Sequence, residues 1–218
     1  MGSIFHYDSP LMRFLGKVAD LLLLNLYLAI LCLPIVTAGA ALTAAHGVLI
    51  KTCRKETDSM TRDFFRMFRS NFKQVTKTWL VVLAMLVISF VSYRLCSLRE
   101  TMVWNIIGGM LLISMVAQVL SLLWLFPILA RFHTTVGAAI KNAVMFVVFY
   151  SPKTVAMAGF TFVPWLLMEN YPAAIGAILP VCLSVPIWLS VSLYNKMFLE
   201  LEQKALASEK ETPVSSKK

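Results

Sequence analysis

Apolar residues follow one another in long runs along this chain, and charged residues gather between the runs. Runs of about 20 apolar residues are long enough to cross a bilayer as helices. They predict membrane elements at residues 18–36, 78–94, 102–126, 154–168 and 174–196, with a short element at 37–50. We therefore predict an all-α fold, a polytopic transmembrane helical bundle of five to six membrane elements. One domain would cover residues 1–200, with a polar tail at 201–218.

The stretch LCLPIVTAGAALTAAHGVL, residues 31–49, is apolar but interrupts its own helix pattern. Pro34 cannot donate a backbone hydrogen bond, and Thr37 and Gly39 can begin a new helix. We expect a turn between two packed elements here rather than a signal-peptide cleavage site, because the apolar sequence continues beyond it. Residues 37–50 would span roughly 21 Å, less than the ~30 Å hydrocarbon, so they form either a re-entrant hairpin or a short span. Pro127 predicts a second break.

Residues 59–77 have the pattern of an amphipathic helix. One arc contains apolar residues: Met60, Phe64, Met67, Phe68, Phe72 and Val75. The opposite arc is basic: Arg62, Arg66, Arg69, Lys73 and Lys77. This pattern predicts a helix in the cytoplasmic interface, touching anionic lipid heads, or else a docking surface for a protein partner. Asn71 falls in the apolar arc, where we expect it to hydrogen-bond a neighbouring element.

Composition fits this picture, since 59% of the residues are apolar, 14% are charged and the mean hydropathy is +0.76. Such values indicate an integral membrane protein. The net charge of +9 would otherwise suggest nucleic-acid binding, but a basic excess is expected in membrane proteins, so we predict no nucleic-acid partner. Eight of the 20 Lys and Arg lie at residues 51–77 and five from Lys196 onward. By the positive-inside rule, this loop and the C-terminus face the cytoplasm, as does the N-terminus if 37–50 returns across the membrane.

Chemistry-bearing motifs are sparse. The cysteines are scattered and no histidine cluster has metal-ligand spacing, so we predict no catalytic residue, cofactor or metal site, and no enzyme. His46 is expected to be a packed or interfacial residue. Ser114, Gln118 and Ser121 share one face of the 102–126 element. They predict either hydrogen bonds between helices or a polar path for a solute.

Three motifs follow one another along the chain: LNLYLAILCLPIVTAGAA at 24–41, RDFFRMFRSNFKQ at 62–74, and FPILARF at 126–132 with KNA at 141–143. Together they resemble the YesL family of bacterial membrane proteins. The residues that match the family pattern are Asn25, Pro34, Thr37, Gly39, Phe64, Phe65, Asn71, Phe72, Lys73, Pro127, Arg131, Phe132 and Asn142. The resemblance implies a small multi-pass protein of the bacterial plasma membrane, but it supplies no catalytic residues.

Two functions follow as hypotheses. YesL-like proteins are often encoded near sugar-uptake ABC transporters, so the resemblance implies an accessory or regulatory component of carbohydrate uptake, with transporter subunits as partners. The alternative is an autonomous transporter of a small solute, for which the interrupted membrane elements and the Ser114/Gln118 face are the supporting features.

Overall fold

The computed structural model describes residues 10–99, 101–132, 134–171 and 182–211, and within them every regular element is a helix. The helices are α1 (Pro10–Cys32), α2 (Ile35–Cys53), α3 (Met60–Ser97), α4 (Met102–Arg131), α5 (Val136–Phe149), α6 (Ser151–Asn170) and α8 (Ser184–Glu211). By length and composition, α1 to α4 could each cross a membrane, and the bent pair α5–α6 adds a fifth candidate if it is one span. The predicted all-α membrane fold is therefore confirmed.

The chain leaves the helical path at Leu33 and Pro34, between α1 and α2. Pro34 has φ −78° and ψ 121°, an extended conformation that suits proline, and precedes the first residue of α2. The hydroxyl of Thr37 reaches back to the carbonyl oxygens of Leu31 and Pro34, at 2.5 and 3.0 Å. Both carbonyls lie at the break between α1 and α2, where the regular backbone hydrogen bonds of a helix are interrupted. At 19 residues, or about 28 Å, α2 is longer than the expected 37–50 element.

Two helix boundaries that the sequence predicted are absent from the structure, one in α3 and one in α4. The 38-residue α3 contains neither Gly nor Pro, so the amphipathic segment 59–77 and the span 78–94 belong to one uninterrupted helix. The helix α4 continues through Pro127, where the sequence predicted a break, and ends at Arg131. Residues 124–129 are all buried. Their packing holds the helix together across the one backbone hydrogen bond that a proline removes.

The second half of the chain bends sharply between α5 and α6, whose axes differ by 101° at Tyr150. Pro152 lies in the first turn of α6, where its missing N–H costs no helical hydrogen bond. The helix α6 contains the expected element 154–168. The first part of the expected tail, up to Glu211, is a continuation of α8. Residues 174–181 of the last expected span lie outside the described residues.

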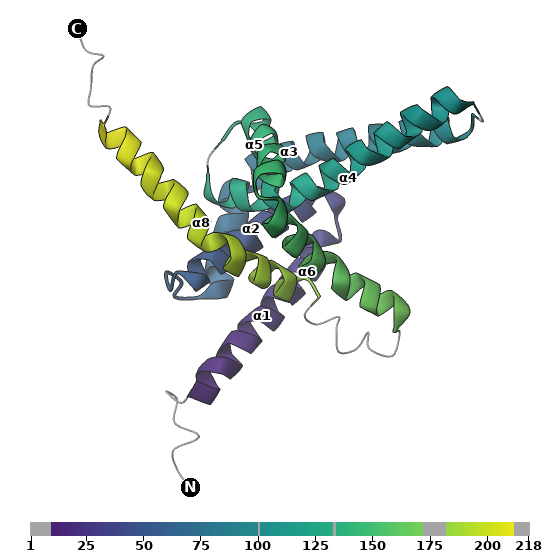
Figure 1. Ribbon diagram of the computed structural model, residues 1–218. Coiled ribbons are helices and arrows are strands. Elements are labelled where there is room, and N and C mark those ends of the chain that lie inside the picture. Colours follow the sequence, from purple (N-terminus) through teal and green to yellow (C-terminus); the bar gives the residue numbers. More distant parts are fainter. Residues whose placement is uncertain (1–9, 100, 133, 172–181, 212–218) are drawn as a thin grey trace.

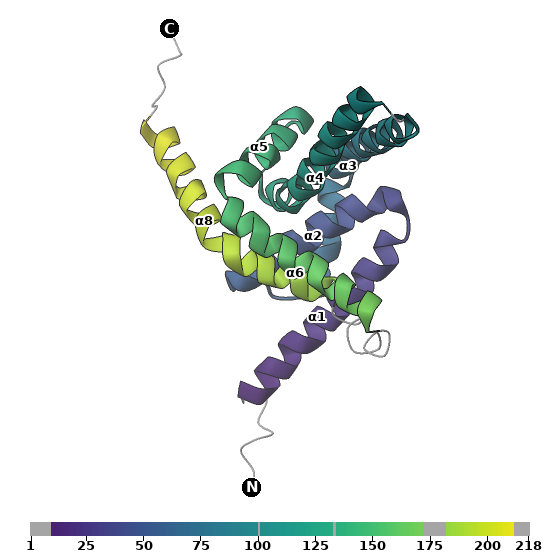
Figure 2. The same cartoon turned by 45° about the vertical axis from the view of Figure 1, so that its right-hand side comes forward.

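The helix α2 forms the centre of the molecule, in contact with α1, α3, α4 and α8. All of residues 39–50 except Leu42 are buried. Their small side chains let the neighbouring helices approach closely. Figures 1 and 2 show α1, the α3–α4 pair, α6 and α8 extending from this centre in different directions, with α6 and α8 side by side.

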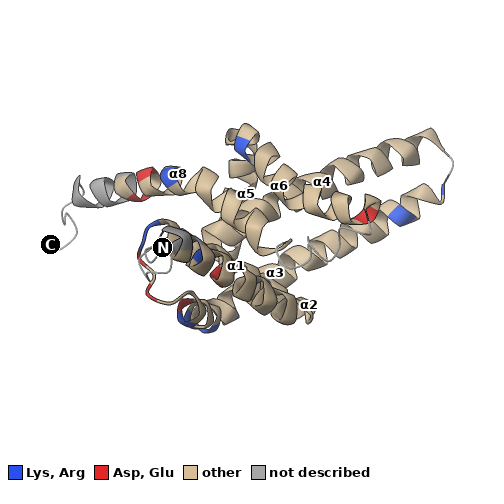
Figure 3. Cartoon of the chain, turned by 90° about the horizontal axis from the view of Figure 1, so that it is seen from below, with Lys and Arg blue, Asp and Glu red and all other residues tan. Residues whose placement is uncertain are grey.

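An uncharged zone lies between the charged residues at the two ends of the α3–α4 pair. In Figure 3 most of the blue and red lies on the side of the ends marked N and C, while the charges at the far end of α3 are those of Arg94 and Arg99. Residues 78–93 of α3 and 102–130 of α4 contain no charged side chain. Two uncharged stretches in adjacent helices, with the basic residues concentrated at one end, are typical of helices that cross a bilayer.

Candidate functional site

Five exposed basic side chains form a stripe along the first half of α3. This basic stripe consists of Arg62, Arg66, Arg69, Lys73 and Lys77. The guanidinium of Arg66 pairs with the buried Asp63 three residues before it. Among the described residues, the other four have no acidic partner. The stripe therefore presents uncompensated positive charge at the surface.

The opposite, aromatic side of this half of α3 packs on protein. The ring of Phe64 is fully buried, with its centroid 5.8 Å from that of Tyr27 on α1. The neighbouring Phe65 contacts the same tyrosine at 5.2 Å, although 41% of Phe65 stays exposed. Phe72 is half-buried against the core, and Met67 lies close to Gly47 of α2. Much of the apolar arc thus packs on α1 and α2, where the sequence led us to expect lipid.

Asn71 lies half-buried within that packed side. We expected its amide to bond a neighbouring element, but no side-chain hydrogen bond of Asn71 occurs within the described part of the chain. The partial exposure of this residue leaves its amide open to solvent or lipid head groups, which lowers the cost of an unmade bond.

The family-pattern residues near the α1–α2 turn have packing roles. Gly39 lies against Trp79 of α3 so closely that an added Cβ would be 2.6 Å from the tryptophan Cβ. The indole N–H of Trp79 donates to the carbonyl of Ile35 at 2.7 Å. Asn25 is buried, and its Oδ1 accepts backbone N–H groups of Leu183 and Ser184 at 3.0 and 3.3 Å. It therefore acts as a cap for the start of α8, supplied by another helix.

A charged cluster joins the ends of α2 and α4 to α8, and we call it the arginine cluster. Arg54 donates to both carboxylate oxygens of Glu202, at 3.0 and 3.3 Å, and to Oδ1 of Asn195 at 3.0 Å. Arg131 donates two hydrogen bonds to the same carboxylate, from Nε and Nη2, at 2.6 and 3.0 Å. Two such bidentate pairs fix the geometry of all three side chains.

Electrostatics within the arginine cluster favour the ionised carboxylate. Burial raises the pKa of Glu202, but the hydrogen bonds and charges of Arg131 and Arg54 outweigh burial and hold this pKa below its ordinary value. Only 5% of the Arg54 side chain is exposed, against 33% for Arg131. With two guanidiniums for one carboxylate, the cluster has a net positive charge.

A buried polar pair lies deeper in the core. Nδ1 of His46 on α2 and the hydroxyl of Tyr194 on α8 are hydrogen-bonded at 2.8 Å, and the imidazole stacks near Phe126 with centroids 6.5 Å apart. His46 is thus a packed residue within a satisfied pair, as expected.

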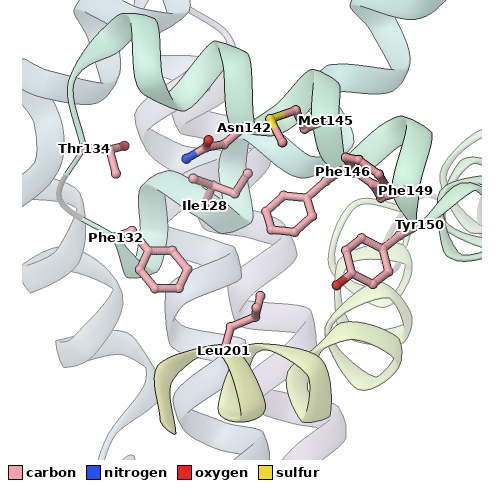
Figure 4. Close-up of a pocket in the computed structure, with 9 residues that line it drawn as sticks. All are labelled: Ile128, Phe132, Thr134, Asn142, Met145, Phe146, Phe149, Tyr150 and Leu201. Atoms are coloured by element: carbon pink, nitrogen blue, oxygen red, sulfur yellow. The ribbon is translucent and has the colours of Figure 1, made fainter. Parts of the chain in front are cut away.

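An open groove of about 610 Å³ lies between the end of α4, α5 and α8. Its walls are largely aromatic, including Phe132, Phe146 and Phe149, and Leu201 of α8 forms the floor in Figure 4. The polar side chains of Thr134 and Asn142 lie toward one end in this view. The groove therefore brings together two family-pattern residues, Phe132 and Asn142, in an amphipathic setting.

The predicted polar face of α4 lines a second, smaller cavity. Ser114, Gln118 and Ser121 border a space of about 290 Å³ between α3, α4 and α5, together with mostly apolar residues. The amide nitrogen of Gln118 donates to Ser89 of α3 at 3.1 Å and to Ser114 at 3.2 Å. Ser121 bonds its own helix at the carbonyl of Ala117. Within the described parts of the chain, the Gln118 Oε1 is buried without a hydrogen-bond partner.

The sequence reading did not single out Arg54, Tyr194 or Glu202. Each one pairs with residues more than 70 positions away in the chain, so no local pattern connects the partners. No signal in the sequence distinguishes Glu202, since Glu200, Glu209 and Glu211 lie in the same C-terminal region.

A family model described as "Protein of unknown function, DUF624" matches residues 21–93, about a third of the chain. The match includes the motifs at 24–41 and 62–74, and the third motif lies beyond it. No curated protein and no solved structure matches this chain.

Proposed function

We propose that this chain is a YesL-like accessory protein of the bacterial plasma membrane that assists carbohydrate uptake by binding subunits of a sugar ABC transporter. In this proposal the basic stripe and the C-terminus face the cytoplasm, as the positive-inside rule favours. The N-terminus lies on the same side. The three sequence motifs support the family, and the family resemblance alone supports the link to carbohydrates.

The observation that carries the accessory role is the way α3 presents its basic stripe. Its aromatic side is held on α1 and α2 through Phe64 and Tyr27, so the helix cannot rotate to hide Arg62 or Arg69. A fixed row of cations, four of which have no acidic partner among the described residues, suits a partner surface rich in Asp and Glu, because complementary charge steers association and sets the register of binding. Less ordering entropy is lost when such a surface is already rigid.

Affinity purification of the full tagged chain from its native membranes tests this role. We expect permease and ATPase subunits of a sugar transporter to co-purify, and to be lost from the double variant Arg62→Glu/Arg69→Glu while the chain stays in the membrane fraction. The matched control is Arg94→Glu/Arg99→Glu, with the same charge change at the far end of the α3–α4 pair. Retention of the subunits by the Arg62/Arg69 variant would contradict docking through the stripe.

A second candidate function, transport of a small solute by this chain alone, is favoured by the cavity beside Gln118. Its buried Oε1 without a partner is a group that a hydroxylated solute would satisfy. In liposomes containing only this protein, uptake of a labelled sugar that is abolished by Gln118→Leu would support transport and weigh against the accessory role. The variant should fold normally, since hydrogen bonds between membrane helices contribute only about 0.6 kcal/mol on average.

A further inference from the structure

A hollow of about 610 Å³ lies beside the start of α5, at the surface of α3. It is lined by Lys73, Gln74, Lys77, Thr134, Thr135 and Val136, with no acidic residue among them. Both lysines are exposed, and neither forms an ion pair in the part of the chain that the structure describes. The hollow therefore offers two ammonium groups without a carboxylate to neutralise them.

The position of the chain beside the lysines is fixed by Gln74. Its Nε2 donates to the carbonyl of Thr134 at 2.6 Å, which ties the segment before α5 to α3. The Oγ1 of Thr134 is buried and has no hydrogen-bond partner among the residues that the structure describes. Buried hydroxyls are usually hydrogen-bonded, so an unpartnered one beside two lysines indicates a missing acceptor.

The hollow lies next to the aromatic groove of Figure 4, because Thr134 lines both. On one side of Thr134 lie the two lysines. On the other side lie Phe132, Phe146 and Phe149. A positive head site joined to an apolar groove matches an amphiphile with an anionic head and a hydrocarbon chain better than it matches a free inorganic anion.

The level of this combined site relative to the bilayer follows from the charge-free stretches. The uncharged stretch 78–93 of α3 begins after Lys77, which lines the hollow, and the stretch 102–130 of α4 ends before Arg131, three positions before Thr134 in the chain. Where an uncharged span gives way to lysine and arginine, the helix enters the head-group region. Lipid head groups therefore lie within reach of Lys73 and Lys77, whose long side chains extend toward the interface.

We propose that the hollow and the groove together bind one anionic phospholipid. Its phosphate is held by Lys73, Lys77 and the Thr134 hydroxyl, and an acyl chain lies along Phe132, Phe146 and Phe149. This site requires a membrane location but does not depend on the accessory role, so either proposal can fail without the other.

Native mass spectrometry of the full chain in neutral detergent tests the site, with phosphatidylglycerol and phosphatidylcholine of identical acyl chains as the probes. We expect one phosphatidylglycerol to be retained in preference to phosphatidylcholine. Lys73→Gln/Lys77→Gln should lower phosphatidylglycerol affinity by roughly 25-fold, since each basic residue near an anionic lipid contributes about fivefold. Thr134→Val, which keeps the side-chain shape, should lower affinity by several-fold while circular dichroism and size-exclusion profiles stay unchanged.

The matched control is Lys55→Gln/Arg62→Gln, which removes the same charge from the same basic region. Arg62 is 11 residues from Lys73, roughly 16 Å along the helix, which is beyond the ~8 Å screening length at physiological salt. Its phosphatidylglycerol affinity should stay close to that of the unmodified chain. Equal losses in the two double variants, or equal retention of the two lipids, would overturn the proposal. Inorganic phosphate that displaces the lipid completely at the same concentration would show a free-anion site and would also overturn it.

Discussion

The central helix α2 and the outer half of the α3–α4 pair are both apolar, but they meet different surroundings. In α2 nearly every residue from Gly39 to Ile50 is buried by other helices. Beyond Trp79 in α3, only Val82 and Cys96 are buried, and residues such as Ile88 and Ile113 are 65% and 72% exposed. An apolar helix therefore forms a protein core in one region and a lipid-facing surface in the other, and the core helix is the less hydropathic, with a mean hydropathy of 1.3 against 2.1 for α3 and 2.3 for α4. Side-chain size distinguishes them, since α2 is rich in Gly and Ala.

Removing one charge should give the largest difference in stability between the two regions. Arg54, at the end of α2, is almost fully buried against Glu202, so Arg54→Gln should lower the free energy of unfolding by about 3 kcal/mol through loss of its hydrogen bonds to Glu202 and Asn195. The exposed Arg94, at the end of α3, serves as the matched site, where Arg94→Gln should change stability by no more than about 0.5 kcal/mol. Denaturant titration in detergent, followed by circular dichroism, measures both. Equal effects would contradict the contrast between buried and exposed ends.

Adding one methyl group should give effects of opposite sign. In Gly39→Ala the new Cβ would meet Trp79 Cβ at 2.6 Å, and since that atom is attached to the α3 backbone, the two helices must separate. We expect a loss of about 2 kcal/mol. In Gly109→Ala on α4 nothing lies within 4 Å of the new atom, so the better helix propensity of Ala should stabilise the chain by about 0.5–1 kcal/mol. Thermal unfolding of both variants tests this, and destabilisation by Gly109→Ala would show that the α3–α4 pair is more tightly covered than described.

Low pH should weaken the arginine cluster at the end of α2 and leave the α3–α4 pair unaffected. This is the smallest of the three expected effects. Because the pKa of Glu202 is held below its ordinary value of 4.5, its stabilising contribution is complete above that pH and is lost as pH falls through the lower folded-state value. As the pH is lowered, the free energy of unfolding of the unmodified chain should therefore fall by about 1 kcal/mol more than that of Glu202→Gln. Glu169→Gln, at an exposed position in α6, is the control and should follow the unmodified chain. An identical acid response in all three proteins would exclude a role for the arginine cluster in acid sensitivity.

Much of the helical pattern could be read from hydropathy, because membrane helices need long apolar runs and the chain supplies them. The break at Pro34 was visible for the same reason that it forms, the missing N–H. The surroundings of each helix were harder to predict. The aromatic arc of α3 has the same periodicity whether it covers lipid or α1, so the contact between Phe64 and Tyr27 was not readable from spacing.

The site residues were predicted unevenly for a related reason. The basic stripe follows from helical geometry alone, and its residues are exposed as that geometry requires. Hydrogen bonding around Gln118 fits the helix-to-helix alternative, while its place beside a cavity leaves the transport alternative as a proposal. The arginine cluster depends on Arg54 and Glu202, which are 148 positions apart, and only the folded chain brings them together.

The cap that Asn25 provides for α8 has a consequence for biosynthesis. The ribosome makes α1 before α8, so α1 enters the bilayer well before Leu183 and Ser184 exist to donate to the Asn25 amide. A polar amide in hydrocarbon is costly until its partners arrive. The first helix thus carries into the membrane a binding position for the last one. Nascent chains that end before α8 should be the forms that membrane chaperones and quality-control proteases recognise.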